Sequence, residues 1–127
     1  MFGAYIRIDN PRVLSGADAQ VERFVTDAVA EVGYQALADV HRILDQSIKR
    51  PTPYYETQIT IDRQRHDRVI VHDRGVVYGP WLEGVSSRNL STKFKGYHSF
   101  RRAANGLVDK VEDLIKPHLV RLLARLK

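Results

Sequence analysis

The centre of the chain reads YETQITIDRQRHDRVIVH from Tyr55 to His72, and this stretch decides the fold class. Its residues alternate between two faces on both sides of a polar turn at Arg63–Asp67. Alternation with a period of two is typical of half-buried strands, so the stretch predicts an antiparallel hairpin whose first strand begins near Tyr55. A third short strand is expected at Gly75–Tyr78, after a turn at Asp73-Arg74.

A long segment with helical periodicity precedes this hairpin. Apolar residues step by three and four from Val21 to Leu44, which predicts one amphipathic helix that runs to about Lys49. Ser15 and Asp18 have the spacing of a capping box at its start. Pro51 and Pro53 end it. Gly33 interrupts the pattern and indicates a close contact with another helix or with backbone.

A second such segment follows, with Ser99 as its expected N-cap and an apolar stripe from Phe100 to Leu126. Pro117 should kink this helix or break it in two. An alternating stretch at Ala4–Ile8 predicts another short strand near the N-terminus. The order strand, helix, hairpin, helix predicts a single α+β domain over residues 1–127, with an antiparallel sheet covered by helices on one face.

Composition narrows the function classes. The 127 residues include no cysteine, which excludes a disulfide scaffold, a thiol nucleophile and a thiolate metal site. No apolar run approaches the ~20 residues that a membrane span needs. The N-terminus lacks the pattern of a signal peptide. We therefore expect a protein made in the cytoplasm, with no membrane partner.

The charge is unevenly distributed. Residues 1–84 contain 10 Lys and Arg against 12 Asp and Glu, whereas residues 85–127 contain 10 against 3. This asymmetry has two interpretations: the last third contacts nucleic acid or an acidic partner, or it forms a solvated helix face with a basic loop. The basic hairpin turn is open to the same two interpretations, as a contact for DNA phosphates or as a charged turn that prevents edge aggregation.

No constellation of residues predicts catalysis or a cofactor. The five histidines (His41, His66, His72, His98 and His118) form no metal-binding pair. His72 and Asp73 are adjacent, so on a strand they face opposite sides. Glu83 is an acid in an aromatic loop without an evident partner. No nucleophile elbow or phosphate-binding glycine motif is present. We expect no enzyme, no cofactor and no metal.

The stretch from Tyr78 to Arg102 is the most unusual part of the chain. It combines the only Trp with four other aromatic residues, three Gly and many cations, and it precedes the second helix without clear periodicity. Loops of this length are usually functional or disordered, and the aromatic content argues against disorder. Three interpretations are open: a partner interface, a local core plug, and a nucleic-acid contact.

A family resemblance bears on this stretch. The run Tyr78-Gly79-Pro80-Trp81-Leu82-Glu83-Gly84 resembles a "Y-[AG]-x-[YWF]-[VLI]-E-x-G" segment that ends the sheet in small head–tail neck (tail completion) proteins of long-tailed double-stranded DNA phages. Phe100-Arg101-Arg102-Ala103 is similar to the segment that opens their last helix. Gly84 follows Glu83 directly and no Pro precedes the last helix, and both features differ from the common pattern.

The resemblance implies a virion structural protein without catalytic activity, which forms a homo-oligomeric ring, hexameric or dodecameric, at the head–tail interface. Its partners would be other connector and tail proteins, and double-stranded DNA passing through the ring. A tail terminator that caps the tail tube is the alternative, and a small basic nucleic-acid-binding protein is the second. The expected inter-subunit contacts are Tyr78, Trp81, Leu82, Phe94, Tyr97, Arg101 and Arg102. The candidate contacts with a DNA channel or an acidic partner are Arg63, Arg65, Arg68, Lys93 and Lys95.

Overall fold

A computed structural model describes residues 3–9, 19–47 and 53–125 of the protein. The elements are, in order, β1 (Tyr5–Asp9), α1 (Ala19–Ser47), α2 (Pro53–Gln58), β2 (Thr60–Arg65), β3 (Arg68–His72), α3 (Gly79–Glu83), α4 (Arg88–Ser91) and α5 (Ser99–Arg125). The predicted capping box at Ser15 and Asp18 lies outside the described residues.

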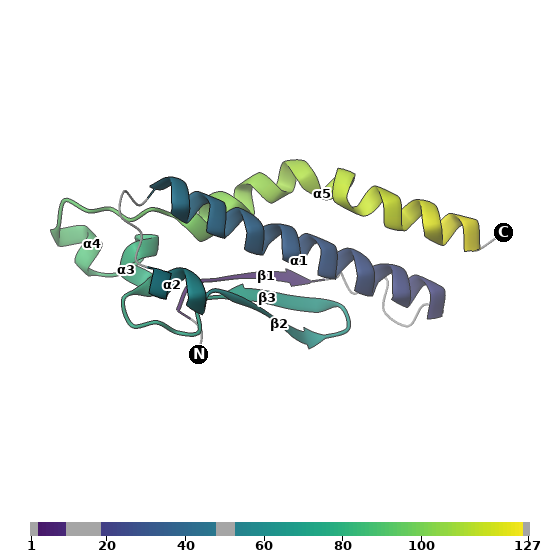
Figure 1. The fold of residues 1–127 in the computed structure, drawn as a ribbon, viewed down its shortest axis with the longest axis horizontal. Coiled ribbons are helices and arrows are strands. Elements are labelled where there is room, and N and C mark those ends of the chain that lie inside the picture. The colour runs from purple at the N-terminus through teal and green to yellow at the C-terminus, as the bar shows by residue number, and fades with distance from the viewer. Residues whose placement is uncertain (1–2, 10–18, 48–52, 126–127) are drawn as a thin grey trace.

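The three strands form one antiparallel sheet in the order β1-β3-β2. Helices α1 and α5 run side by side and α1 covers one face of the sheet (Figure 1). The core between them is made of apolar side chains from α1, the central strand and the start of α5, among them Ala36, Val40, Leu44, Val71 and Phe100. The predicted α+β class is confirmed.

Gly33 lies where α1 crosses the sheet. A Cβ atom at this position would lie 2.7 Å from Cγ2 of Val69 and 2.8 Å from Cδ1 of Ile61. Because any larger residue would push the helix away from the strands, the glycine sets the closeness of the two layers. A close contact is therefore present, but it is made with side chains of β2 and β3 and not, as expected, with a helix or with backbone.

The predicted start of the hairpin was wrong. Tyr55 belongs to the short helix α2, and β2 begins only at Thr60. Tyr55 and Ile59 are both buried, and their spacing of four residues fits one face of a helical turn as well as one face of a strand. Pro53 favours the helix, since its fixed φ suits the first helical turn.

The predicted third strand at residues 75–78 was also wrong. Arg74 and Gly75 have φ values of 59° and 73°, which turn the chain away from the sheet directly after β3. Val77 is 95% exposed and follows in this turn. The third strand is instead β1, which pairs with β3 so that Ile6 lies opposite Val71.

Helix α5 continues through Pro117 without a break, and it bends along its length (Figure 1). The single long helix is confirmed, whereas a division into two helices is not. Beyond the proline, Leu122 is buried and Leu119, Val120 and Leu123 are exposed. No helix in the described part of the chain combines the length and apolarity needed to cross a membrane.

Candidate interaction site

Residues 78–84, whose sequence resembles a segment of the phage neck proteins, include the short helix α3, and the last residue of α3 is the buried Glu83. Oε1 of Glu83 accepts the backbone N–H of Phe100 at 2.9 Å, and Oε2 accepts that of Arg101 at 2.9 Å. These are unpaired donors of the first turn of α5, so Glu83 caps that helix from a distant position in the chain. The prediction that Ser99 caps this helix was wrong, because Ser99 is already helical and its hydroxyl lies 3.4 Å from Glu83.

The chain between these two elements is a loop of residues 84–98 whose ends meet. The backbone N–H of Tyr97 donates to the carbonyl of Leu82 at 2.7 Å. Gly84 and Gly96 pass each other so closely that a Cβ on Gly96 would lie 2.3 Å from Cα of Gly84. Both glycines have positive φ, 94° and 98°, a conformation that other residues rarely adopt. Loop 84–98 is therefore closed at its base.

Asn89 holds the interior of loop 84–98. It is buried, and its Nδ2 donates to the carbonyl oxygens of Trp81 at 3.0 Å and of Phe94 at 3.1 Å. Its Oδ1 accepts the backbone N–H of Ser86 at 3.0 Å. Nζ of Lys95 donates to the carbonyl oxygen of Asn89 at 2.7 Å. These bonds satisfy buried polar groups and give the loop one defined shape.

Three of the predicted contact residues form an aromatic cluster at this loop. The ring of Phe94 lies 4.4 Å from that of Trp81 and 4.9 Å from that of Tyr97, the latter in an edge-to-face arrangement. All three side chains are half-buried. Leu82 packs against the main core, and Tyr78 lies 5.8 Å from the ring of Tyr55. The structure thus brings Trp81, Phe94 and Tyr97 together and directs Leu82 inward.

The buried carboxylate of Asp73 explains why residue 79 is a glycine. The carboxylate of Asp73 is fully buried, and it accepts the Tyr55 hydroxyl at 3.0 Å and the backbone N–H of Gly75 at 3.0 Å. A Cβ on Gly79 would lie 2.0 Å from this carboxylate. Burial, followed by the charge of Asp73, raises the pKa of Tyr55 above its ordinary value, so its hydroxyl stays a donor. His72 precedes Asp73 in the chain, but its side chain contacts a different carboxylate: Nε2 of His72 lies 2.5 Å from Oδ2 of Asp62.

The candidate DNA contacts fall into two separate places. Arg65 and Arg68 lie in the hairpin and share the carboxylate of Asp9, at 3.1 and 2.7 Å. The hydrogen bond from Arg68 holds the pKa of Asp9 below its usual value. Lys93 and Lys95 belong to loop 84–98, at the opposite end of the sheet from the hairpin turn (Figure 1).

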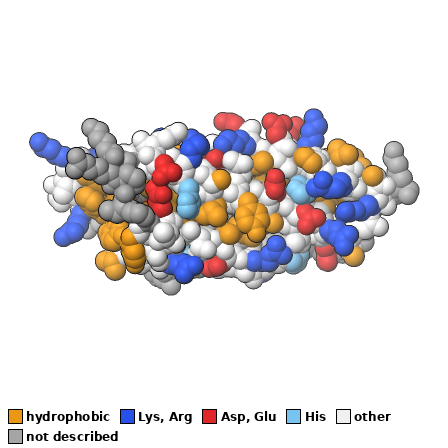
Figure 2. Space-filling view, viewed as in Figure 1, with side chains coloured by type: hydrophobic (Ala, Val, Ile, Leu, Met, Phe, Trp, Pro, Cys, Tyr) orange, Lys and Arg blue, Asp and Glu red, His pale blue; other side chains and the backbone are white. Residues whose placement is uncertain are grey.

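Figure 2 shows the charge pattern on one face. At the end formed by α4 and loop 84–98, Lys and Arg side chains stand apart from acidic ones, whereas elsewhere on this face both signs are interspersed. Arg101 is exposed beside this end, and Arg102 donates to the Ser47 hydroxyl at 3.1 Å and to the carbonyl of Tyr97 at 3.3 Å. Among the described residues, no three His, Asp or Glu side chains gather as a metal site requires.

A second feature is an apolar groove of about 520 Å³ between β1, α1 and α5. Val108 lines it and is 76% exposed. Comparisons with family models, curated proteins and solved structures found no match to this chain.

Sequence reasoning missed the residues that build the loop. Glu83 appeared without a partner because its partner is the backbone of α5, and Asn89 gave no signal in the sequence. In the sequence, Gly84 and Gly96 lie on either side of a polar segment with one aromatic residue. This pair of glycines is the only sequence feature that indicates a loop closed at its base. The composition of the segment did point to Trp81, Phe94 and Tyr97, which the structure brings together as an aromatic cluster.

Proposed function

We propose that this chain is a structural subunit of the head–tail interface of a long-tailed DNA phage, which forms the ring of a neck or tail-completion protein. The observation that carries the proposal is the fixed shape of loop 84–98. Its base is closed by Gly84 and Gly96, and its interior is held by Asn89. Such a projection loses little conformational entropy on binding, so its exposed side chains suit a permanent contact.

Ring assembly also needs a second, different surface on the same chain. In a heterologous interface one patch of each subunit meets another patch of its neighbour, and the contact closes by rotation. Loop 84–98 supplies one patch, with Leu90 86% exposed at α4 and the half-buried aromatic cluster behind it. The apolar groove between β1, α1 and α5 supplies a candidate for the other, with a second copy of this chain as its occupant.

The charge distribution supports the same proposal. The first two-thirds of the chain are slightly acidic and the last third is strongly basic. Neighbouring subunits or stacked rings that set one part against the other would attract each other and reject the reverse orientation. Loop 84–98 belongs to the basic part, and the predicted rim residues Arg101 and Arg102, at the start of α5, are exposed.

The test is native mass spectrometry with negative-stain imaging of the protein, alone and mixed with portal-proximal or tail-tube proteins. Hexameric or dodecameric rings are expected in at least one of these mixtures. Leu90→Glu should abolish them without unfolding the subunit, because Leu90 is exposed. Tyr34→Glu, at an exposed position of α1, is the control. A strict monomer that joins no neck or tail component would contradict the proposal.

The same mixtures distinguish a connector from a tail terminator. A terminator binds the end of the tail tube and shows no affinity for portal-proximal proteins, whereas a connector binds on the head side. Either result is compatible with a ring built through loop 84–98. The partner that recruits the chain therefore assigns its place in the neck.

A further inference from the structure

Loop 84–98 and the first turns of α5 contain several cations and no acidic residue of their own. Residues 84–108 include Arg88, Lys93, Lys95, Arg101 and Arg102, and no Asp or Glu. The nearest preceding acid is Glu83, whose two oxygens are bonded to the backbone of α5. The local positive charge is therefore not neutralised by the chain around it.

Two of the hairpin cations, Arg65 and Arg68, differ in this respect. Arg65 and Arg68 are paired with Asp9, and Arg65 also lies 3.1 Å from Asp67. Within the described residues, none of the ion pairs involves Arg88, Lys93, Lys95 or Arg101. An anion that meets Arg65 or Arg68 must displace a carboxylate, whereas one that meets the loop cations displaces no acidic side chain. The loop is the stronger anion-binding surface.

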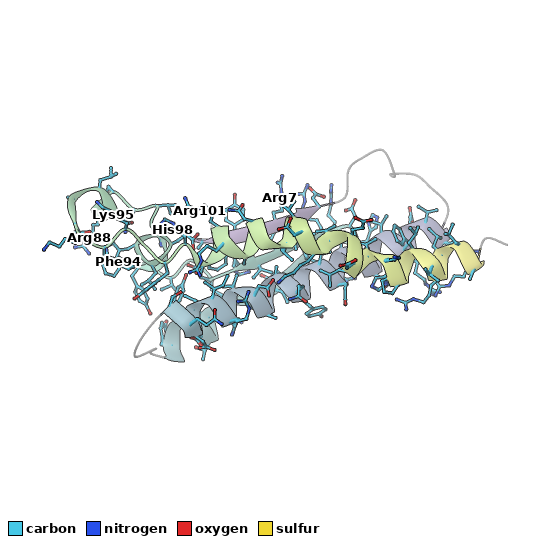
Figure 3. All side chains as sticks on the ribbon, turned by 90° about the horizontal axis from the view of Figure 1, so that it is seen from above. Arg7, Arg88, Phe94, Lys95, His98 and Arg101 are labelled. Carbon is cyan, nitrogen blue, oxygen red and sulfur yellow. The ribbon has the colours of Figure 1, made fainter. Side chains whose placement is uncertain are left out.

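These four residues define a cationic face, and their arrangement fits an extended partner. In Figure 3, Arg88, Lys95 and Arg101 follow one another from the loop to the start of α5, with His98 between the last two and Arg7 farther along on β1. Arg7 and Arg101 both line a hollow of about 420 Å³ between β1 and α5, and Glu83, which caps α5, lines it as well. Arg88, Lys95 and Arg101 thus extend along the molecule instead of converging on one pocket.

We propose that the cationic face, Arg88, Lys93, Lys95 and Arg101, binds the phosphate backbone of double-stranded DNA without sequence preference. A row of separate cations matches a regular row of phosphates, and such contacts position a protein without reading bases. Single-stranded nucleic acid fits less well, because it needs free aromatic faces on which bases stack. The ring of Phe94 is instead packed between those of Trp81 and Tyr97. The proposal does not depend on ring formation.

The experiment is fluorescence anisotropy of a labelled DNA duplex of random sequence, titrated with the full chain between low and physiological salt. Each neutralised phosphate contributes about −0.9 to the slope of log K against log salt, so four contacts predict a slope of about −3.6. Arg88→Gln with Lys93→Gln should reduce the steepness of this slope by about 2 and weaken binding at low salt at least tenfold.

The matched control is Arg23→Gln with Lys116→Gln, which removes the same charge at exposed positions of α1 and α5 outside the cationic face. It should leave the slope nearly unchanged. Circular dichroism checks that each variant is folded. The proposal is overturned if the wild-type protein does not bind duplex at low salt, or if the control loses as much affinity as the loop variant.

Two further arms identify the partner. A single strand of equal phosphate number should bind more weakly than the duplex, and a poly-glutamate peptide of equal charge should compete poorly. A preference for the single strand would point to base stacking and overturn the proposal. Equal or tighter binding of poly-glutamate would assign the cationic face to an acidic protein and would overturn it as well. Ring formation is measured separately, so failure of one proposal leaves the other testable.

Discussion

Glu83 and Phe100 are joined by a 2.9 Å hydrogen bond between a buried carboxylate oxygen and the backbone N–H of the second residue of α5. A helix is usually capped by the residue that precedes it, yet here that residue is His98, with φ of 53°, and the cap comes from α3. The start of the long helix and the base of loop 84–98 therefore form one unit, which fixes the loop relative to the core.

Replacement of Glu83 tests this coupling. Glu83→Ala leaves two N–H groups at the start of α5 without their acceptor, and hydrogen bonds to a charged group are worth about 1.5–3 kcal/mol each in stability. Because two such bonds are lost, we expect the free energy of unfolding in urea to fall by about 3 kcal/mol or more. Glu83→Gln retains one good acceptor and should lose about half as much.

Hydrogen exchange locates the effect. In Glu83→Ala the amides of Phe100 and Arg101 should exchange faster. The amides of Val40 and Leu44 in α1 should remain more protected than these two, as in the wild type. If both variants unfold at the wild-type urea concentration, the cap contributes nothing and the coupling of α3 to α5 is absent.

The two long helices were predictable because the spacing of three and four residues between apolar positions is repeated over many helical turns in each. Short segments were not: Tyr55 and Ile59 satisfy a helical turn and a strand equally, and the choice depends on the buried Asp73 that Tyr55 binds. The site shows the same division. Composition singled out Trp81, Phe94 and Tyr97, but the acceptor of the α5 amides and the crossing of Gly84 with Gly96 are contacts between distant residues, which no local pattern contains.

The glycines of loop 84–98 give a second prediction. Gly96→Ala would place a Cβ 2.3 Å from the backbone of Gly84 in a positive-φ conformation, so the base of the loop has to open. We expect a loss of about 2–4 kcal/mol in the free energy of unfolding, since a backbone clash adds to the conformational strain. Gly84→Ala should behave similarly.

Gly106 is the matched control for these two variants. It lies inside α5, and a Cβ there meets no other atom within 4 Å. Gly106→Ala should therefore raise stability by up to about 1 kcal/mol through helix propensity alone. Equal effects of the three substitutions would show that the base of loop 84–98 is not closed as described.

The buried pair of Tyr55 and Asp73 gives a third prediction. Tyr55→Phe removes the hydroxyl that Oδ2 of Asp73 accepts, and it leaves this oxygen enclosed by Gly79 without a donor. An unsatisfied buried charged group costs about 1–3 kcal/mol or more, so we expect a loss of that size in thermal or urea unfolding. Tyr54→Phe, at an exposed position of α2, should change stability by less than about 0.5 kcal/mol. Similar losses in both variants would rule out a special role for the bond to Asp73.

The ion pairs of Asp9 give a prediction about pH. The hydrogen bond and the charge of Arg68, together with the charge of Arg65, hold the pKa of Asp9 below its ordinary value. The folded chain then binds this proton less readily than the unfolded chain, so the contribution of Asp9 to stability is fully present above the unfolded pKa of about 4. It is lost as the pH falls through the lower folded pKa.

Asp9→Asn removes this contribution. Because the side chains of Asp9 and Arg68 are each 25% exposed, solvent screens the pair, and we expect a loss of about 0.5–1 kcal/mol at pH 7. The difference between variant and wild type should shrink when urea unfolding is repeated at successively lower pH, as Asp9 of the wild type takes up its proton. Asp27→Asn, an exposed position on α1, controls for the change in net charge. A difference that persists at low pH would mean that Asp9 acts through packing and not through its charge.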